Sequence, residues 1–492
     1  MIARFFFVFL LIQSTLAQKP PPEKPSQKWL TLNGQSPAVI ARGGFSGLFP
    51  DSSEYALQFA LSTSLPGVII FCDLQLSKDG YGFCLSGIRL ENSTTIADFA
   101  PKGQKAYNVN GEQLRGWFAL DYMIDDLLQK VALTQNIFTR SSYFDGTRLL
   151  AVEDITGLRP PPIFWLNVQY YNFYKQNKID PTLYIKEALN IQKINFISSP
   201  EIGFLKNING IVNKARTKLI FRFLEADAIE PTTKQKYSSI LKDLSSIKLF
   251  ASGILVPKEY IWPVDAEMYL EAPTNLVADA HKEGLEVYAS GFANDIPGSY
   301  NYSYDPTTEY LQFIDNGQFS VDGLLTDFPP TASEAIACFA NNKNATKSKG
   351  KALIISHNGA SGVYPGSTDL AYQQAVDDGA DIIDCSVQMS KDGVAFCLES
   401  PDLTGDTTAL STFMTKAATI PEIQPKSGVF SFDLTWSEIL TLKPQLKNPF
   451  AKEGLQRNPK NKNKGKLISL TEFLELSKQK AVSGILINIE DS

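Results

Sequence analysis

Two short motifs in the chain share two glycines and differ at a residue that bears on chemistry. The first reads VIARGGFSG over residues 39–47, and the second reads ISHNGASG over residues 355–362. The second contains His357, one of two histidines in the chain, and histidine exchanges a proton near neutral pH. The first has Arg42 at the same place, and arginine stays protonated and cannot act as a base. Of the two motifs, the second is the one able to transfer protons.

The two motifs belong to a longer repeat. The stretch ARGGFSGLFPDSSEYALQFA aligns without a gap with SHNGASGVYPGSTDLAYQQA, and VIIFCDLQLSKDGYGFCL aligns with DIIDCSVQMSKDGVAFCL. The copies are about 315 residues apart, far beyond the period of solenoid repeats. The chain therefore contains a duplicated domain.

Eight apolar runs of strand length occur in the first copy. They are residues 38–41, 67–76, 163–168, 195–198, 218–223, 253–256, 285–290 and 323–327. Several are nearly continuous, which is typical of strands that are buried on both faces. Eight strands alternating with helices over about 300 residues predict an α/β fold, a (β/α)8 TIM barrel. In such a barrel His281 lies on an outer helix, so we interpret it as structural or exposed.

The barrel prediction sets the expected domain limits. The first barrel takes residues 37–340, with an inserted subdomain at about 86–161, because that stretch is too long for a simple crossover. A polar linker follows at 341–350, and a second copy occupies residues 351–492. This copy ends on ILINIEDS, which corresponds to the third strand of the first copy, FWLNVQYY. We therefore expect a partial second barrel in a C-terminally truncated product or fragment.

Four of the five cysteines form two pairs with one spacing. Cys72 and Cys84 lie on either side of one SKDG turn, and Cys385 and Cys397 lie on either side of the other. An Asp-Gly turn between apolar runs predicts a hairpin, across which Cys72 and Cys84 could face each other. A disulfide and two buried thiols both remain open, and the pairing of the cysteines is not fixed by the sequence.

The N-terminal residues predict secretion. Residues 1–17 have a basic start, an apolar run too short to span a bilayer and a small-x-small cleavage site, which together predict a signal peptide. A Pro-rich segment, 18–36, follows. Three N-x-S/T sites, Asn92, Asn301 and Asn344, are candidate glycosylation sites. We therefore expect a secreted glycoprotein at the cell surface or in the cell wall.

No other window has the length and hydrophobicity of a transmembrane helix, and the C-terminus lacks the tail of a GPI signal. The net charge of −6 argues against nucleic acid as a partner.

Several motifs together resemble those of the glycerophosphodiester phosphodiesterases. The matches are Gly44, Ser46-Gly47, Pro50, Asp73, Lys78-Asp79-Gly80 and VDGLLTDFPPTA from Val321. The sequence is similar to the secreted plant branch with tandem domains, which is usually GPI-anchored. The resemblance implies a (β/α)8 barrel that hydrolyses a glycerophosphodiester to an alcohol and sn-glycerol 3-phosphate. It also implies a divalent cation, Ca²⁺ or Mg²⁺, and two histidines acting as base and acid.

The resemblance indicates a degraded site in the first copy. Arg42 and Ser86 stand where the family has its two histidines. Phe71 and Gln169 stand where it has glutamates, which leaves Asp73 as the one expected metal carboxylate. We therefore expect the first barrel to be inactive and to bind a divalent ion weakly at best.

The second copy keeps more of the family pattern. His357 matches the first histidine, Asp384 can replace the first metal glutamate, and Glu490 keeps the third-strand glutamate. Glu399 replaces the second histidine, and a glutamate can serve as general acid if its pKa is raised. The resemblance thus implies a partial site of one imidazole and three carboxylates.

Two function classes follow from these residues. One is an extracellular glycerophosphodiester phosphodiesterase of lipid and glycerol metabolism, with weak activity. The other is a catalytically inactive cell-surface protein that acts in cell-wall organisation. A third and less favoured hypothesis is the binding of cell-wall polysaccharide by the aromatic side chains of QYYNFYKQNK, residues 169–178, for which ordinary surface tyrosines are the plainer interpretation.

Overall fold

The computed structural model describes residues 29–296, 298–340, 352–453, 455–480 and 482–489. The chain divides into two compact units. The first contains most of residues 29–340, and the second contains residues 352–489 and also takes in two loop segments, 262–273 and 293–306. The predicted signal peptide and the predicted linker lie outside the described residues.

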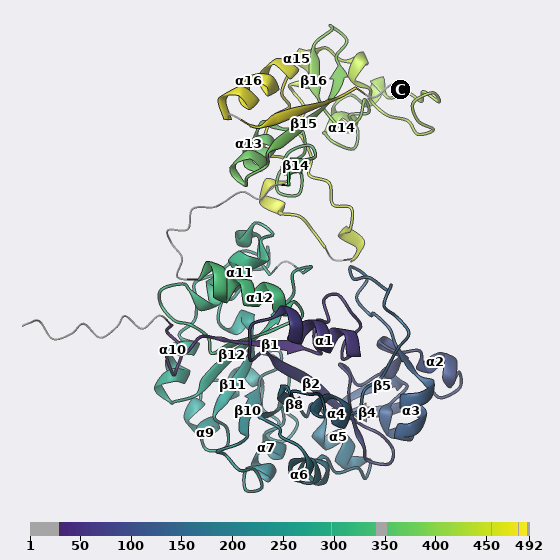
Figure 1. The fold of residues 1–492 in the computed structure, drawn as a ribbon. Helices are drawn as coiled ribbons and strands as arrows, with labels where there is room; N and C mark the ends of the chain where they lie inside the picture. Colours follow the sequence, from purple (N-terminus) through teal and green to yellow (C-terminus); the bar gives the residue numbers. More distant parts are fainter. Residues whose placement is uncertain (1–28, 297, 341–351, 454, 481, 490–492) are drawn as a thin grey trace, which may run out of the picture. The chain divides into compact units, whose positions relative to one another are not determined.

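A closed barrel of eight parallel strands forms the first unit (Figure 1). The strands are β1 (Ala38–Arg42), β2 (Ile69–Leu76), β8 (Ile163–Asn167), β9 (Phe196–Ser199), β10 (Lys218–Arg222), β11 (Gly253–Pro257), β12 (Glu286–Phe292) and β13 (Gly323–Thr326). Each pairs with the next, and β1 closes the ring by pairing with β13, so that Ala38 lies opposite Gly323. The predicted (β/α)8 barrel is therefore confirmed.

The barrel interior explains why the strands read as nearly continuous apolar runs. One buried cluster contains side chains from β1, β2, β8, β10, β11, β12 and β13. Within it the Trp165 ring stacks on Phe196 and meets Tyr288 edge to face. Neighbouring residues of the same strands are buried toward the outer helices, so both faces of the sheet exclude water.

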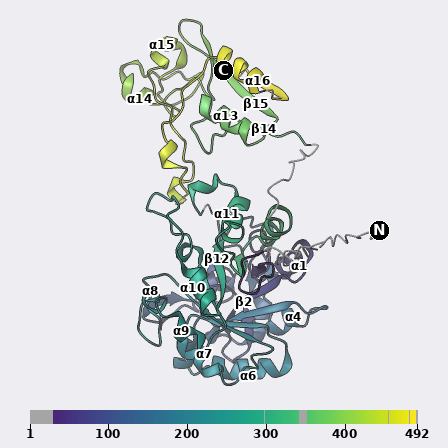
Figure 2. The same cartoon turned by 90° about the vertical axis from the view of Figure 1, so that its left-hand side faces the viewer.

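Helices cover the outside of this barrel. They are α1 (Glu54–Thr63), α5 (Tyr171–Gln176), α6 (Pro181–Ile191), α7 (Ile202–Ile208), α8 (Tyr237–Ile240), α9 (Leu244–Lys248), α10 (Leu276–Lys282), α11 (Pro306–Ile314) and α12 (Pro329–Glu334), with the short 3-10 helix η3 (Lys258–Tyr260) and the short π-helix η5 (Ala335–Phe339). The 3-10 helix η4 (Tyr300–Tyr302) lies in the segment 293–306, which groups with the second unit. Figure 2 shows α6, α7 and α9 along one part of the first unit. Within the described ranges, no helix is both long enough and apolar enough to cross a bilayer.

A small subdomain interrupts the barrel after the hairpin that β2 forms with β3 (Gly82–Cys84). Its elements are η1 (Leu90–Asn92), α2 (Ile96–Phe99), β4 (Lys105–Val109), β5 (Glu112–Gly116), η2 (Ala119–Asp121), α3 (Ile124–Lys130), β6 (Ala132–Leu133), β7 (Thr147–Arg148) and α4 (Val152–Thr156). It has a buried cluster of its own that includes Leu90, Ile96 and Leu127. This separate core lets a long connection fold without disturbing the strand order of the barrel.

The second unit contains a smaller mixed sheet. Its elements are β14 (Ile355–Ser356), α13 (Asp369–Asp377), β15 (Ile382–Met389), β16 (Ala395–Cys397), α14 (Ala409–Thr412), η6 (Met414–Lys416), η7 (Ser431–Asp433), α15 (Trp436–Ile439), η8 (Ala451–Glu453), η9 (Pro459–Asn461), α16 (Leu470–Lys480) and β17 (Gly484–Asn488). Strands β14 and β17 pair in parallel with β15, and β16 forms an antiparallel hairpin with it.

The aligned stretches of the two units share local contacts as well as sequence. A Cβ on Gly44 would lie 2.5 Å from the Ala56 carbonyl oxygen, and a Cβ on Gly359 would lie 2.7 Å from that of Ala371. Disulfides join Cys72 to Cys84 and Cys385 to Cys397 across the two hairpins. The repeat thus reproduces a turn packed against a helix and a cross-linked hairpin in each unit.

The aromatic segment 169–178 is not a surface patch, which corrects the hypothesis of a glycan site there. Tyr171, Phe173 and Tyr174 are all buried. The Tyr174 hydroxyl donates to Gln75 Oε1 at 2.7 Å, and the Phe173 ring meets Tyr107 of the inserted subdomain. Helix α5 is covered by the barrel on one side and by the subdomain on the other, so its aromatic rings are unavailable to a polymer.

Candidate functional site

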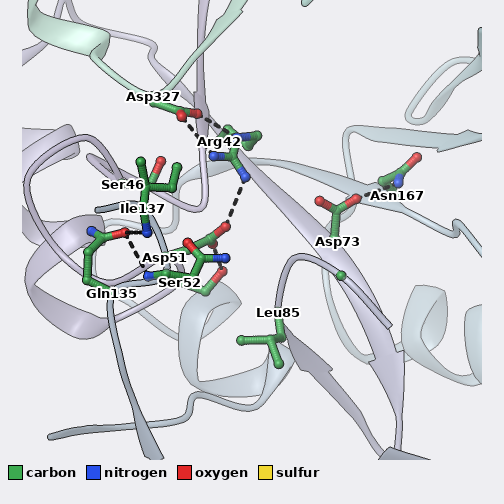
Figure 3. Close-up of polar contacts among 12 residues, drawn as sticks. Arg42, Ser46, Asp51, Ser52, Asp73, Leu85, Gln135, Ile137, Asn167 and Asp327 are labelled. Atoms are coloured by element: carbon green, nitrogen blue, oxygen red, sulfur yellow. Dashed lines mark hydrogen bonds and ion pairs between the residues drawn. The ribbon is translucent and has the colours of Figure 1, made fainter. Parts of the chain in front are cut away.

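Arg42, at the end of β1, is held between two carboxylates. Its Nε and Nη2 donate to the two oxygens of Asp327 at 2.5 and 2.8 Å, and its Nη1 donates to Asp51 Oδ2 at 3.2 Å (Figure 3). Arg140, from the inserted subdomain, donates to Asp327 Oδ2 at 2.7 Å. Two guanidinium groups and two carboxylates therefore neutralise each other at the C-terminal end of the barrel, where TIM-barrel enzymes have their active sites.

The mutual stabilisation of these groups shows in their pKa values. Burial works to raise the pKa of Asp327, but Arg42 and Arg140 outweigh it and hold that pKa below its ordinary value. Burial works to lower the pKa of Arg42, and the two aspartates outweigh it and raise that pKa. Arg42 is therefore a permanent cation, as its residue type predicts, and cannot take up a proton from a substrate.

Ser86, the other degenerate catalytic position, joins the same network. Burial raises the pKa of Asp51, against the lowering effects of Arg42 and of hydrogen bonds from Ser52 and Ser86. Arg42 and Ser86 therefore both bind the carboxylate of Asp51. The two positions where the family resemblance expects proton-transfer histidines are brought together, but as parts of a structural ion-pair network.

Asp73 is likewise engaged with protein groups. Its Oδ1 accepts from Asn167 Nδ2 at 2.6 Å and from Arg222 Nη1 at 3.1 Å. Phe71 is buried in the barrel interior, and Gln169 accepts a hydrogen bond from Asn167. Arginine cations lie where a metal ion would need to be, so the residues of the first unit do not fit a divalent cation. In the described part of the chain, no group of three or more His, Cys, Asp or Glu side chains is arranged to hold a metal.

In the second unit, His357 is oriented by its neighbours. Its Nδ1 lies 2.9 Å from Asp384 Oδ2, and its Nε2 lies 3.1 Å from Asn358 Nδ2. Because a carboxylate accepts and an amide nitrogen donates, Nδ1 carries the proton and Nε2 is the acceptor. The His357 side chain is 70% exposed, whereas that of Asp384 is 6% exposed. His357 Nε2, an acceptor nitrogen, therefore lies near the surface, and the buried carboxylate of Asp384 fixes the orientation of its ring.

Both oxygens of Asp384 accept hydrogen bonds. Oδ2 accepts from His357, and Oδ1 accepts from the backbone amide of Asn358 at 2.5 Å. Asp384 thus orients the imidazole. Glu490, the other predicted metal ligand of this unit, lies outside the described residues. Among the described residues of the second unit, no three His, Cys, Asp or Glu side chains are arranged to hold a metal.

A pocket of about 220 Å³ lies beside His357 and is also lined by Glu399. Glu399 lines the same pocket as His357, but it is half exposed and its Oε2 lies 2.8 Å from Lys447 Nζ. Lys447 also binds Asp406 at 2.7 Å, and Arg457 lines the same pocket. Burial works to lower the pKa of Lys447, and its hydrogen bonds to Asp406 and Glu399 outweigh it, so that pKa is raised.

Sequence reasoning missed the partners that come from distant segments. Arg140, Lys447 and Arg457 lie in insertions without any periodic pattern or motif that points to the site. Glu201 was also missed, and its carboxylate is fully buried after the end of β9. Burial raises the pKa of Glu201 to about 7, against the lowering effect of hydrogen bonds from the Asn172 amide and the Asn110 side chain.

The predicted glycosylation sites differ in what the structure describes. Asn92, at the end of η1, and Asn301, in η4, are exposed. The side-chain oxygen of Asn301 accepts from the Leu270 amide at 2.8 Å, which leaves its nitrogen available to carry a glycan. Asn344 lies outside the described residues.

Comparisons with known proteins agree with these motifs. The model of the glycerophosphoryl diester phosphodiesterase family matches residues 357–492. Glycerophosphodiester phosphodiesterase GDPDL6 of Arabidopsis thaliana is 59% identical over 495 residues, which cover 99% of this chain and 66% of the relative. GDPDL7 of the same plant is 59% identical, with 99% and 65% covered. The chain thus spans about two thirds of the length of these curated relatives.

Solved structures are more distant. A phosphodiesterase from Oleispira antarctica, in complex with the product sn-glycerol-3-phosphate, is 15% identical, with a TM-score of 0.40 over 62% of this chain and 98% of that chain. The close plant relatives match nearly the whole chain, and the family model falls on the unit that keeps His357. The chain belongs to the glycerophosphodiester phosphodiesterase family.

Proposed function

We propose that the second unit carries the glycerophosphodiester phosphodiesterase-like function, with weak activity, and that the first barrel is not catalytic. The observation that carries this proposal is the orientation of His357 by Asp384, with Nε2 as the free-base nitrogen beside a pocket. In this mechanism Nε2 accepts the proton of the attacking hydroxyl group. In the structure the side-chain amide of Asn358 donates to this nitrogen, so the attacking hydroxyl has to displace that side chain.

The reason for weak activity lies in the leaving-group step. The second histidine of the family pattern is replaced by Glu399, and a glutamate acts as general acid from apolar surroundings that keep it protonated. Glu399 is instead half exposed and paired with Lys447. Lys447 is shared between Glu399 and Asp406. Arg457 Nη1, in contrast, donates to the Ser361 and Lys447 carbonyls, so Arg457 is the lining cation that can meet an anionic phosphodiester. Binding is thus better supported than protonation of the leaving alcohol.

The test is a hydrolysis assay with glycerophosphocholine on this chain and on its full-length form, with Ca²⁺, with Mg²⁺ and with a chelator. Replacing His357→Gln should abolish release of glycerol 3-phosphate. The matched control is His281→Gln. His281 lies on the outer helix α10, where its Nε2 is 2.9 Å from Asp322 Oδ2, so this replacement should not affect turnover. Activity that survives His357→Gln would contradict the assignment.

A catalytically inactive role at the cell surface is the second candidate. The first barrel favours it, because Arg42, Asp51 and Asp327 satisfy each other where a substrate and metal would bind. The inactive role would be supported if neither this chain nor its full-length form hydrolysed the substrate in any condition of the same assay. Secretion is part of both candidates. N-terminal sequencing of the mature protein should begin at Gln18, and enzymatic deglycosylation should lower the mass at Asn92 and Asn301.

A further inference from the structure

Two adjoining hollows lie at the N-terminal ends of barrel strands, at the end opposite to Arg42 and Asp327. The larger, of about 850 Å³, is lined by residues that precede β9 and β10, with Lys193 and Arg216 among them. The smaller, of about 320 Å³, is lined by residues that precede β10 and β11, including three lysines, Lys214, Lys218 and Lys248. Thr217 lines both hollows, so they adjoin each other.

The lining of these hollows is basic and contains no acid. Neither has an aspartate or glutamate among its described lining residues, although the chain has 52 acidic and 46 basic residues. Gathering cations whose charge is only partly offset costs electrostatic free energy in the unbound protein, and one of the five, Lys218, is paired with a carboxylate, that of Glu286. A bound anion would offset that cost, so the segregation of charge itself points to an acidic ligand.

Three of the five cations are available to such a ligand. Lys218 binds Glu286 at 2.7 Å, and Lys248 donates to the Gly284 carbonyl at 2.5 Å. The side chains of Lys193, Lys214 and Arg216 are exposed and form no ion pair or hydrogen bond with the part of the chain that the structure describes. At the other end of the barrel, by contrast, Arg42 and Arg222 are each bound to an aspartate.

We propose that this basal strip, made up of Lys193, Lys214 and Arg216 around Thr217, binds an acidic polysaccharide, a chain of carboxylated sugars. Lys193 precedes β9, and Lys214 and Arg216 precede β10, so the three cations lie on two adjacent loops whose strands are ~4.8 Å apart. Exposed amide side chains, Asn190 and Asn213, lie among the cations and can hydrogen-bond to sugar hydroxyls. A polymer that runs along the strip therefore meets alternating charge and hydrogen-bonding groups.

An anionic membrane is the competing ligand for a basic strip. Ile191 and Leu249 are 78% and 77% exposed beside the hollows, and apolar side chains at a basic surface can enter a lipid interface. The exposed amides favour the polysaccharide, because Asn190 and Asn213 can hydrogen-bond to sugar hydroxyls but offer nothing to a lipid acyl chain. Apolar side chains at the rim can instead contact the faces of sugar rings. Vesicles are therefore included in the test.

The test measures binding of the full chain to three probes: an oligogalacturonate of about ten units, its fully methyl-esterified neutral form, and phosphatidylglycerol vesicles. We expect binding of the charged oligosaccharide, weakened by salt because exposed charges are screened. Replacing Lys193→Gln, Lys214→Gln and Arg216→Gln together should lower that affinity at least tenfold and flatten its salt dependence.

The matched control is Lys102→Gln, Arg115→Gln and Lys178→Gln, which removes the same charge from exposed positions outside the hollows and should change affinity less than twofold. Equal binding of the neutral form, equal loss in the two triple variants, or binding of vesicles alone would overturn the proposal. Hydrolysis of glycerophosphocholine should be unchanged in the basal-strip variant, so the result is independent of the proposed catalytic function.

Discussion

A single carboxylate, Asp327, binds two guanidinium groups at the end of the barrel, the buried one of Arg140 and the partly buried one of Arg42. Replacing Asp327→Asn keeps the shape of the side chain but removes the counter-charge that Asp327 supplies to Arg140 and leaves Arg42 paired with Asp51. Breaking a buried ion pair by removing one partner costs about 3–5 kcal/mol. We expect a loss of that order in the free energy of unfolding of the first unit, measured by urea denaturation.

The control for this prediction is Asp279→Asn. Asp279 binds Lys282 at 2.9 Å on the surface of α10, where its side chain is 50% exposed. Exposed pairs contribute about 0–1 kcal/mol, so the control should change stability by less than that. Similar losses in the two variants would show that Asp327 is not the centre of a buried network.

Glu201 predicts a pH dependence of stability. Its pKa is about 7 in the folded protein, whereas a glutamate in an unfolded chain has a pKa of about 4.3. Between these values the folded state keeps a proton that the unfolded state has lost. The contribution is therefore fully present below about pH 4.3 and is lost as the pH rises through 7.

In Glu201→Gln this loss should disappear. We expect the stability of the original protein to fall relative to the variant by on the order of 2–3 kcal/mol between pH 5 and pH 8. The control is Glu187→Gln, at an exposed position, and its curve of stability against pH should run parallel to that of the original protein. Parallel curves for Glu201→Gln as well would mean that the buried carboxyl titrates normally.

The sequence predicted the residues of the site better than their partners. Arg42, Ser86 and His357 could be located because they occupy aligned positions in a repeat with a known family pattern. Their partners Arg140 and Lys447 could not, because each lies in an insertion where folding, not spacing, brings it to the site. Glu201 carried no signal either, since burial alone shifts its pKa and burial of one polar residue cannot be read from a strand pattern.

At the scale of elements, the glycine turns after β1 and β14 define how each unit packs on its first helix. Gly44 has φ of +83° and lies against the Ala56 carbonyl, so Gly44→Ala meets both backbone strain and a clash. Gly80 has φ of +82°, and a Cβ added there would have no atom within 4 Å, so Gly80→Ala meets strain alone. We expect Gly44→Ala to cost at least about 2 kcal/mol more than Gly80→Ala in thermal denaturation.

The same comparison can be made in the second unit. Gly359 has φ of +73° and lies against Ala371, whereas Gly393, with φ of +81°, has no neighbour within 4 Å of the position that a Cβ would take. The loss of stability caused by Gly359→Ala should exceed that caused by Gly393→Ala by a similar margin. A difference in one unit and none in the other would show that the two turns are not equivalent.

The eight strands were predictable because burial on both faces leaves a continuous apolar run that few other elements produce. Helix α5 was misread because its local sequence mixes tyrosines with lysine, asparagine and glutamine, as a surface segment does. Its burial depends on the inserted subdomain, and the Phe173 contact with Tyr107 joins segments that no local pattern relates.

At the scale of the whole molecule, the two units differ in how their strands are covered. Leu219, Ile220 and Phe221 of β10 are buried, and the strand is paired on both sides by β9 and β11. In β17, Ile485, Leu486 and Ile487 are 40%, 51% and 37% exposed, and β15 is its one partner among the described residues. Backbone amides in poorly covered strands open more readily.

We therefore expect the amides of β17 to exchange with deuterium at least tenfold faster than those of β10, measured by mass spectrometry of the native chain. Peptides from β15, which is paired on both sides, serve as the internal control and should exchange more slowly than β17. Equal protection of β17 and β10 would show that the exposed side chains of β17 do not mark a less stable region.

The bond between Arg42 and Asp327 also has a consequence for the order in which the barrel forms. The two residues are 285 positions apart in the sequence, and they join the first strand of the barrel to the segment that follows its last strand. During synthesis Asp51 follows Arg42 after nine residues, but Asp327 is made much later, so the pair of Arg42 and Asp327 cannot form until nearly the whole unit has left the ribosome. Contacts between such distant residues form late, because the loop between them has to be ordered first. A change at Asp327 should therefore act mainly on the rate at which the closed barrel opens, and much less on the rate at which the strands first assemble.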